Sequence, residues 1–297
     1  MWLDWHWAVV FAAILGVAGI VAARSSNARI RGASAFARET ALVLILYSIW
    51  QYAGRMSLVR VDEAFVNGRW VWDVERALHL PSEVSLEQAL LPSAPIMQFL
   101  NLYYAAVHVP ALIACLVWLF VTHRDQYPRV RTTLALTTFA CLVIQLIPVA
   151  PPRMYPQLGF VDAAARYGQS VYGKVGTGIA DQLSAMPSVH VAWAAIVALA
   201  VIVAGTGRWR YWILAHPILT VVAVTATANH WWLDGVAALV LLLVAWQVDR
   251  VTRAAFTRGR AAPSGADPVL VDLTHDPDAT PEREPALDPS GATSGAR

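Results

Sequence analysis

The sequence predicts an all-α, polytopic membrane protein with about seven transmembrane helices. Of its 297 residues, 57% are hydrophobic and only 14% are charged, whereas a water-soluble domain usually carries about 25% charged residues. Its mean hydropathy is +0.50. A spanning helix needs about 20 mostly apolar residues, and the segments that meet this requirement are Trp7–Ala23, Ala41–Met56, Met97–Val121, Thr132–Ala150, Ser188–Gly205, Tyr211–Ala228 and Trp231–Val248.

The basic residues predict how these spans are oriented. Thirteen lie in the loops after spans one, three and five and after span seven, and seven lie in the longer loops on the opposite side. Cytoplasmic loops carry the excess of lysine and arginine, so we expect a cytoplasmic C-terminus and an outward-facing loop before span five. The net charge of +2, without a basic stripe, indicates no nucleic-acid partner.

Two regions lie outside the predicted bundle. The outer loop 58–94 contains Trp70 and Trp72, which fit an aromatic belt at the membrane surface. Ser82 is a candidate N-cap for a short surface helix, with Glu83 in its first turn. The segment 261–297 is rich in Pro, Asp, Gly and Ser, and we expect it to be disordered and cytoplasmic.

Polar residues gather at the outer ends of three predicted spans. Ser188 and His190 open span five, His230 and Asp234 open span seven, and Arg153 follows span four. Ionisable groups at such positions are costly and are candidates for function. The orientation was predicted from the loop charges alone, so the placement of all these residues on one side supports a shared site.

These residue types supply the parts of a phosphoryl-transfer site. Asp234 lies four residues after His230, so it can accept a hydrogen bond from one ring nitrogen and leave the other as a nucleophile or base. His190, on another helix, can protonate a leaving oxygen. Ser188 with the free amides of its helix start can bind an anion, and Arg153 can clamp phosphate oxygens.

Each feature also has a structural interpretation. The His230–Asp234 pair can be a buried hydrogen bond, Ser188 an ordinary N-cap, and Arg153 a snorkelling arginine after a helix stop. Two other functions stay open. A metal-dependent membrane hydrolase would use His190, His230 and Asp234 as three ligands. A non-enzymatic transporter or lipid-binding protein would line a path with the same residues.

The motifs Pro-Ser-Val-His at 187–190 and His-Trp-Trp-Leu-Asp at 230–234, with Arg153 before them, resemble those of the type-2 phosphatidic acid phosphatase superfamily. That family is marked by Lys-x6-Arg-Pro, Pro-Ser-Gly-His and Ser-Arg-x5-His-x3-Asp. Here Leu146, Val189, Ala223 and Val224 occupy the places of the lysine, the glycine and the Ser-Arg pair. With these departures, and with NLYYAAVHVP at 101–110 and VAPPRMYPQLGFVD at 149–162, the chain is similar to bacterial members of the inositolphosphotransferase and inositol phosphorylceramide synthase-like branch.

The resemblance implies a six-helix catalytic domain over 41–250, preceded by an extra transmembrane helix and cytoplasmic loop over 1–40. It implies a lipid phosphatase or headgroup phosphotransferase of the bacterial plasma membrane. The substrate would be a lipid phosphate or phospholipid, bound at an extracytoplasmic site without a metal or other cofactor. By the same resemblance His230 forms a phosphohistidine, Asp234 orients it, and His190 is the general acid and base.

Three further residues are candidates for substrate binding. Lys174, the only lysine in the chain, can replace the missing cation or be a solvated loop charge. His108 can line the headgroup cavity or be a buried, hydrogen-bonded histidine. Asp162 can contact a sugar or inositol hydroxyl or cap a turn. The dipeptide His216-Pro217 is interpreted as a helix kink rather than as part of a site.

Overall fold

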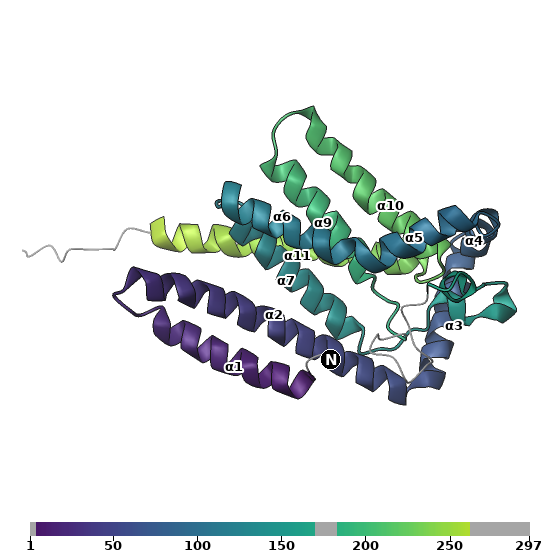
Figure 1. Cartoon of the computed structure of the whole chain (residues 1–297), viewed down its shortest axis with the longest axis horizontal. Coiled ribbons are helices and arrows are strands. Elements are labelled where there is room, and N and C mark those ends of the chain that lie inside the picture. The colour runs from purple at the N-terminus through teal and green to yellow at the C-terminus, as the bar shows by residue number, and fades with distance from the viewer. Residues whose placement is uncertain (1–3, 170–182, 262–297) are drawn as a thin grey trace, which may run out of the picture. The chain divides into compact units, whose positions relative to one another are not determined.

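The computed structural model describes residues 4–169 and 183–261, and these residues form helices with no β-strand (Figure 1). The chain divides into two compact units, Met1–Ala254 and Ala255–Arg297. Almost all of the tail predicted to be disordered lies outside the described residues. The α-helices are α1 (Trp5–Ala22), α2 (Ala28–Val59), α3 (Val61–Ala77), α4 (Glu83–Leu90), α5 (Ala94–Ala106), α6 (His108–Thr122), α7 (Tyr127–Ile144), α8 (Ala163–Arg166), α9 (Val189–Ala204), α10 (Ala215–Ala226) and α11 (Trp232–Ala261).

The described helices are those of a membrane protein. Three helical segments are long and apolar enough to cross a membrane: Trp5–Ala22, Ala28–Tyr52 and Trp232–Phe256. If the bent pair α5–α6 is counted as one more span, the number rises to four. The helix α9 is apolar but shorter, and α10 has only 12 residues. The all-helical class is therefore confirmed, while the count of seven spans stays a prediction.

The first two helices form a hairpin (Figure 1). Asp4 caps α1 by accepting a hydrogen bond from the amide of His6 at 3.1 Å. A Cβ on Gly19 would lie 2.7 Å from Cγ of Arg38, so glycine permits the close approach of α2. The predicted second span, Ala41–Met56, is only the later part of α2, which begins at Ala28.

The predicted third span is one helix broken in two. Between α5 and α6 the axis bends by 49°. Pro110 has no amide hydrogen to donate one turn back, which breaks the helix locally. The ring of His108 lies at this break, with Nδ1 3.2 Å from the carbonyl oxygen of Tyr104.

The predicted fourth span is too long at its end. The helix α7 stops at Ile144, because Pro148 cannot continue a helix and disfavours helical geometry at the residue before it. The chain then runs extended beside 183–185: the amide of Val149 donates to Leu183 at 2.6 Å, and the amide of Ala185 donates to Val149 at 3.0 Å. This pairing carries the chain from α7 to the segment that precedes α9.

The predicted sixth span also differs from the structure. Residues Arg208–Leu214 form a 3-10 helix, and α10 begins only at Ala215. His216 and Pro217 therefore lie in the first turn of α10, where proline is tolerated because its amide needs no partner. The interpretation of this dipeptide as a kink was wrong.

The predicted outer loop, 58–94, folds into two helices, α3 and α4. Ser82 caps α4 as predicted, accepting from the amide of Ser85 at 3.5 Å. Trp70 is exposed, whereas Trp72 packs against the aromatic core around Trp231. The buried acidic side chains of this region were not predicted; they are Glu75, Glu83 and Glu87.

Candidate active site

The His230–Asp234 pair lies at the start of α11. The helix begins at Trp232, so His230 precedes it and Asp234 is in its first turn. Nδ1 of His230 lies 2.8 Å from the carbonyl oxygen of Ala185 and 3.2 Å from Oδ2 of Asp234. A carbonyl oxygen can only accept, so Nδ1 carries the hydrogen of the neutral ring. Nε2 is then left with its lone pair, as a nucleophile requires.

His190 lies beside this pair at the start of α9. Its ring centroid is 5.7 Å from that of His230, and its buried Nδ1 has no hydrogen-bond partner among the described atoms. The amide of Ser188 donates to the carbonyl oxygen of Asp234 at 3.1 Å. This bond joins the beginnings of α9 and α11, and so holds the two histidines in one place.

Ser188 itself is fully buried, and its hydroxyl oxygen accepts from the amide of Val191 at 3.4 Å. It therefore caps α9. A phosphate contact by Ser188 stays a prediction.

Arg153 reaches the same region from the segment after α7. Its Nη1 donates to Oδ1 of Asn229 at 2.6 Å, and its amide donates to the carbonyl oxygen of Ala228 at 2.8 Å. Asn229 immediately precedes His230, so the guanidinium is held next to the residue that precedes this histidine. The structure thus brings together Arg153, His190, His230 and Asp234.

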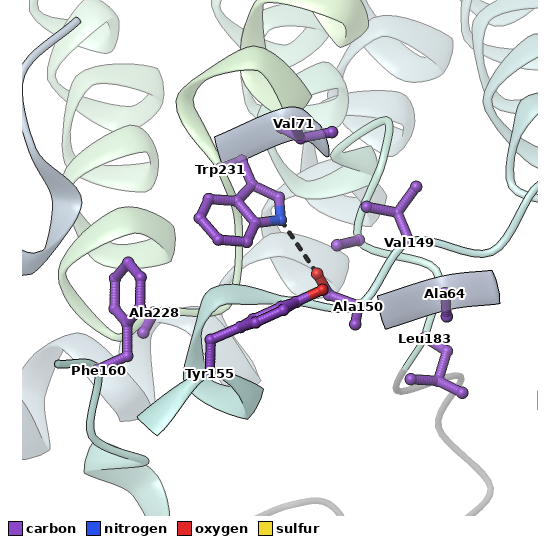
Figure 2. Packing of buried hydrophobic residues seen from close by; sticks show 10 residues of the cluster. Ala64, Val71, Val149, Ala150, Tyr155, Phe160, Leu183, Ala228 and Trp231 are labelled. Carbon is purple, nitrogen blue, oxygen red and sulfur yellow. Dashed lines mark hydrogen bonds between the residues drawn. The ribbon is translucent and has the colours of Figure 1, made fainter. Parts of the chain in front are cut away.

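A buried aromatic core supports this arrangement. Figure 2 shows Trp231 above Tyr155, with its Nε1 donating to the carbonyl oxygen of Ala150 at 3.0 Å. The rings of Tyr155 and Phe160 each lie 5.7 Å from that of Trp231. Because Trp231 follows His230 directly, this packing fixes the loop that carries His230.

His108 extends the site on the far side of His190. Its ring centroid is 5.0 Å from that of His190, and its Nε2 lies 3.2 Å from the hydroxyl of Thr220. His108 is thus a buried, hydrogen-bonded histidine that also contacts the site. Its contact with a lipid headgroup stays a prediction.

Sequence reasoning did not identify several residues that lie near the site. The ring of His216 lies 5.7 Å from His108, and its Nδ1 is hydrogen-bonded to the hydroxyl of Tyr103. The ring of Tyr104 lies 4.5 Å from His190. The available signal for Tyr104 was its position one turn before the candidate His108 in the same apolar segment, although the helix breaks between the two residues.

The remaining candidates lie elsewhere or are not described. Asp162 caps α8 by accepting from the amide of Ala165 at 2.9 Å, as the capping alternative predicted, so its substrate role stays a prediction. Lys174 lies outside the described residues. Within 4–169 and 183–261, no group of three or more His, Cys, Asp or Glu side chains is placed to hold a metal ion.

A comparison with known protein families matches residues 69–248 to the PAP2 superfamily. The chain belongs to the PAP2 superfamily. The match begins within α3, later than the start at 41 that the resemblance implied, and leaves α1 and α2 outside. It includes every candidate site residue. No curated protein and no solved structure matches the chain. Membership of the PAP2 superfamily indicates a phosphatase or phosphotransferase, with lipid phosphates as the substrate class.

Proposed function

We propose that the chain is a lipid phosphotransferase or phosphatase that works through a phosphohistidine on His230. The observation that carries this proposal is the environment of the His230 ring. Two acceptors, Ala185 and Asp234, hold the hydrogen on Nδ1, while the second histidine, His190, lies 5.7 Å away between ring centroids. The PAP2 superfamily match supports the same chemistry.

In the first step, Nε2 of His230 attacks phosphorus and a nitrogen–phosphorus bond forms. The bond from phosphorus to the alkoxide oxygen breaks, and His190 gives its proton to that oxygen. Asp234 stabilises the positive charge that the attacking ring acquires. Arg153, held by Asn229, binds the equatorial oxygens.

In the second step, His190 removes a proton from water or from an acceptor hydroxyl. The resulting oxygen attacks phosphorus, the nitrogen–phosphorus bond breaks, and His230 returns to its starting form. Water as acceptor gives hydrolysis of the bound phosphoryl group, and an alcohol gives a new phosphate ester.

We propose transfer to an alcohol as the main reaction, as in the inositolphosphotransferase-like branch. The departures from the family motifs support this proposal. Val224, at the place of the third-motif arginine, is buried in an apolar cluster with Tyr104, Cys141 and Val191. No cation can be accommodated at Val224 without displacing that packing, so phosphate binding depends on other groups.

We further propose that the site faces the extracytoplasmic side of a bacterial plasma membrane and that the C-terminus is cytoplasmic. The charge of the loops supports this orientation. Residues 1–40 would add a transmembrane helix and cytoplasmic loop to a catalytic domain over 41–250.

The test compares His230→Ala and His190→Ala with the wild type in purified, detergent-solubilised protein. His6→Ala is the control, because His6 lies on α1, outside the matched region. Release of phosphate and headgroup exchange are measured on a panel of lipid phosphates and phosphodiesters, and an acid-labile phosphoprotein is trapped.

We expect His230→Ala to abolish both activities and the phosphoprotein. We expect His190→Ala to slow turnover by about 10²- to 10⁴-fold. Undiminished activity of His230→Ala in both assays would refute the mechanism. Loss of wild-type activity with a chelator, together with resistance to vanadate, would favour a metal-dependent hydrolase instead.

A further inference from the structure

Carboxyl groups of α3 and α4 accept hydrogen bonds from the first turn of α11. The first amides of a helix have no partner within it. Here the amide of Leu233 donates to Oε1 of Glu75 at 2.7 Å, and the amide of Trp232 lies 3.5 Å from Oε1 of Glu83. The amide before them, that of Trp231, donates to Oδ2 of Asp234 at 2.9 Å.

Glu75 and Glu83 are fully buried, and their carboxyl groups face adjacent amides of α11 and the same nitrogen of Arg76. Oε2 of Glu83 accepts from Nη2 of Arg76 at 3.1 Å, whereas Oε2 of Glu75 lies 4.0 Å from the same nitrogen. One arginine cannot neutralise two carboxylates, and the buried Oε2 of Glu75 meets no hydrogen-bond donor among the described atoms, so one proton shared by the two carboxyl groups satisfies both. The shared proton therefore belongs on Glu75.

The surroundings of Glu75 favour its neutral form. The charged or titratable groups that face it among the described residues are Arg76 on α3, Glu83 on α4 and Asp234 on α11. Burial is the largest effect, and together with the neighbouring carboxyl group of Glu83 it raises the pKa of Glu75 from 4.5 to about 9.

We infer that Glu75 and Glu83 are positioning residues for the reaction: they form a proton-sharing carboxyl pair that fixes the first turn of α11 and, with it, His230 and Asp234. This inference rests on the proposed function. The turn also positions His190, because the carbonyl oxygen of Asp234 accepts from the amide of Ser188.

Loss of the shared proton would disturb the same turn. An ionised Glu75 places a second negative charge against Glu83 and near Asp234, with only Arg76 to offset them. The repulsion loosens the bonds to the amides of Trp232 and Leu233. Activity should therefore fall on the alkaline side, through kcat rather than KM, since the pair contacts the catalytic turn and not the substrate.

The test uses Glu75→Gln, which keeps an acceptor for Leu233 and a hydrogen for Glu83 but cannot ionise. Glu75→Ala removes both. The matched control is Glu87→Gln. Glu87 is also a buried glutamate, on α4, but it accepts from the amide of Val161 at 3.1 Å and not from an amide of α11. Pulsed hydrogen exchange of the peptide 231–236 is measured from pH 7 to pH 10, normalised to intrinsic rates, alongside the pH profiles of kcat and KM.

We expect the wild type and Glu87→Gln to lose kcat and amide protection near pH 9, and Glu75→Gln to keep both. Glu75→Ala should exchange at least about tenfold faster at pH 7. If kcat and amide protection of Glu75→Gln fall at alkaline pH as they do in the wild type, the inference is overturned, even if Glu75→Ala fails to fold. If neither a lipid phosphate nor a phosphodiester is turned over, the proposed function fails, but the exchange of the wild type and Glu75→Gln still tests the pair.

Discussion

Asp234→Asn should reduce activity far less than the loss of an orienting carboxylate usually does. Where a carboxylate alone fixes the histidine tautomer, asparagine lowers kcat by about 10⁴-fold. Here the carbonyl oxygen of Ala185, at 2.8 Å, still holds the hydrogen on Nδ1 of His230. What is lost is one hydrogen bond between charged groups, about 1.5–3 kcal/mol, so kcat/KM should fall about 10- to 150-fold.

The assay is steady-state turnover, by the purified variant, of the lipid phosphate or phosphodiester that the wild type accepts, with thermal unfolding to establish that the variant is folded. Asp249→Asn is the matched control, since Asp249 is also a buried aspartate of α11 but bonds to Arg253 at 2.8 Å. It should change stability and leave kcat/KM near the wild-type value. A loss of about 10⁴-fold in a folded Asp234→Asn protein would refute the reasoning, because Asp234 and not Ala185 would then set the tautomer.

Three further predictions concern the support of the site. Gly68→Ala would place a Cβ 2.2 Å from the hydroxyl of Tyr155 and 2.6 Å from the carbonyl oxygen of Ala150. Thermal unfolding should therefore show that the variant loses about 1–3 kcal/mol of stability. A more stable variant, as the higher helix propensity of alanine alone would give, would show that this close contact is absent. Trp231→Phe leaves the buried carbonyl of Ala150 without its donor and should cost about 1–3 kcal/mol in denaturant unfolding, whereas an unchanged midpoint would contradict that bond. Folding raises the pKa of Glu75 from 4.5 to about 9, mainly by burial, so the folded state binds more protons than the unfolded state between pH 4.5 and about 9. The free energy of unfolding should therefore fall by up to about 1.4 kcal/mol per pH unit as the pH rises through this range. The same slope in a Glu75→Gln protein would show that another group causes the pH dependence.

Local signals in the sequence predicted the parts of the site that depend on near neighbours. Ser82 and Ser188 cap their helices because a hydroxyl before an apolar run satisfies the first amides. The spacing of His230 and Asp234 predicted their contact, although α11 begins only at Trp232, after His230. The acceptor that fixes the tautomer, Ala185, could not be found this way, since a backbone carbonyl leaves no mark in the sequence.

Hydropathy failed where apolar character continues beyond a helix. Residues up to Ala150 are as apolar as those of α7, yet the chain after Ile144 pairs with 183–185. Pro148 was the signal that a helix could not continue. The buried acids are a different case: Glu75 and Glu83 have the sequence pattern of a solvated outer loop, and their burial depends on amides of α11 about 150 residues away in the chain.

The charges at the site favour a phosphodiester over a phosphomonoester. A monoester carries a charge of about −1.5 to −2 at neutral pH, whereas a diester carries a single charge. Among the site residues that the structure describes, Arg153 carries the positive charge, and Val224 fills the place of a second arginine with apolar packing. With one permanent cation and the proton that His190 donates, the site compensates a dianion less fully than a site with two arginines would. The substitution that removes a cation therefore supports the proposed headgroup transfer between alcohols over hydrolysis of a phosphomonoester.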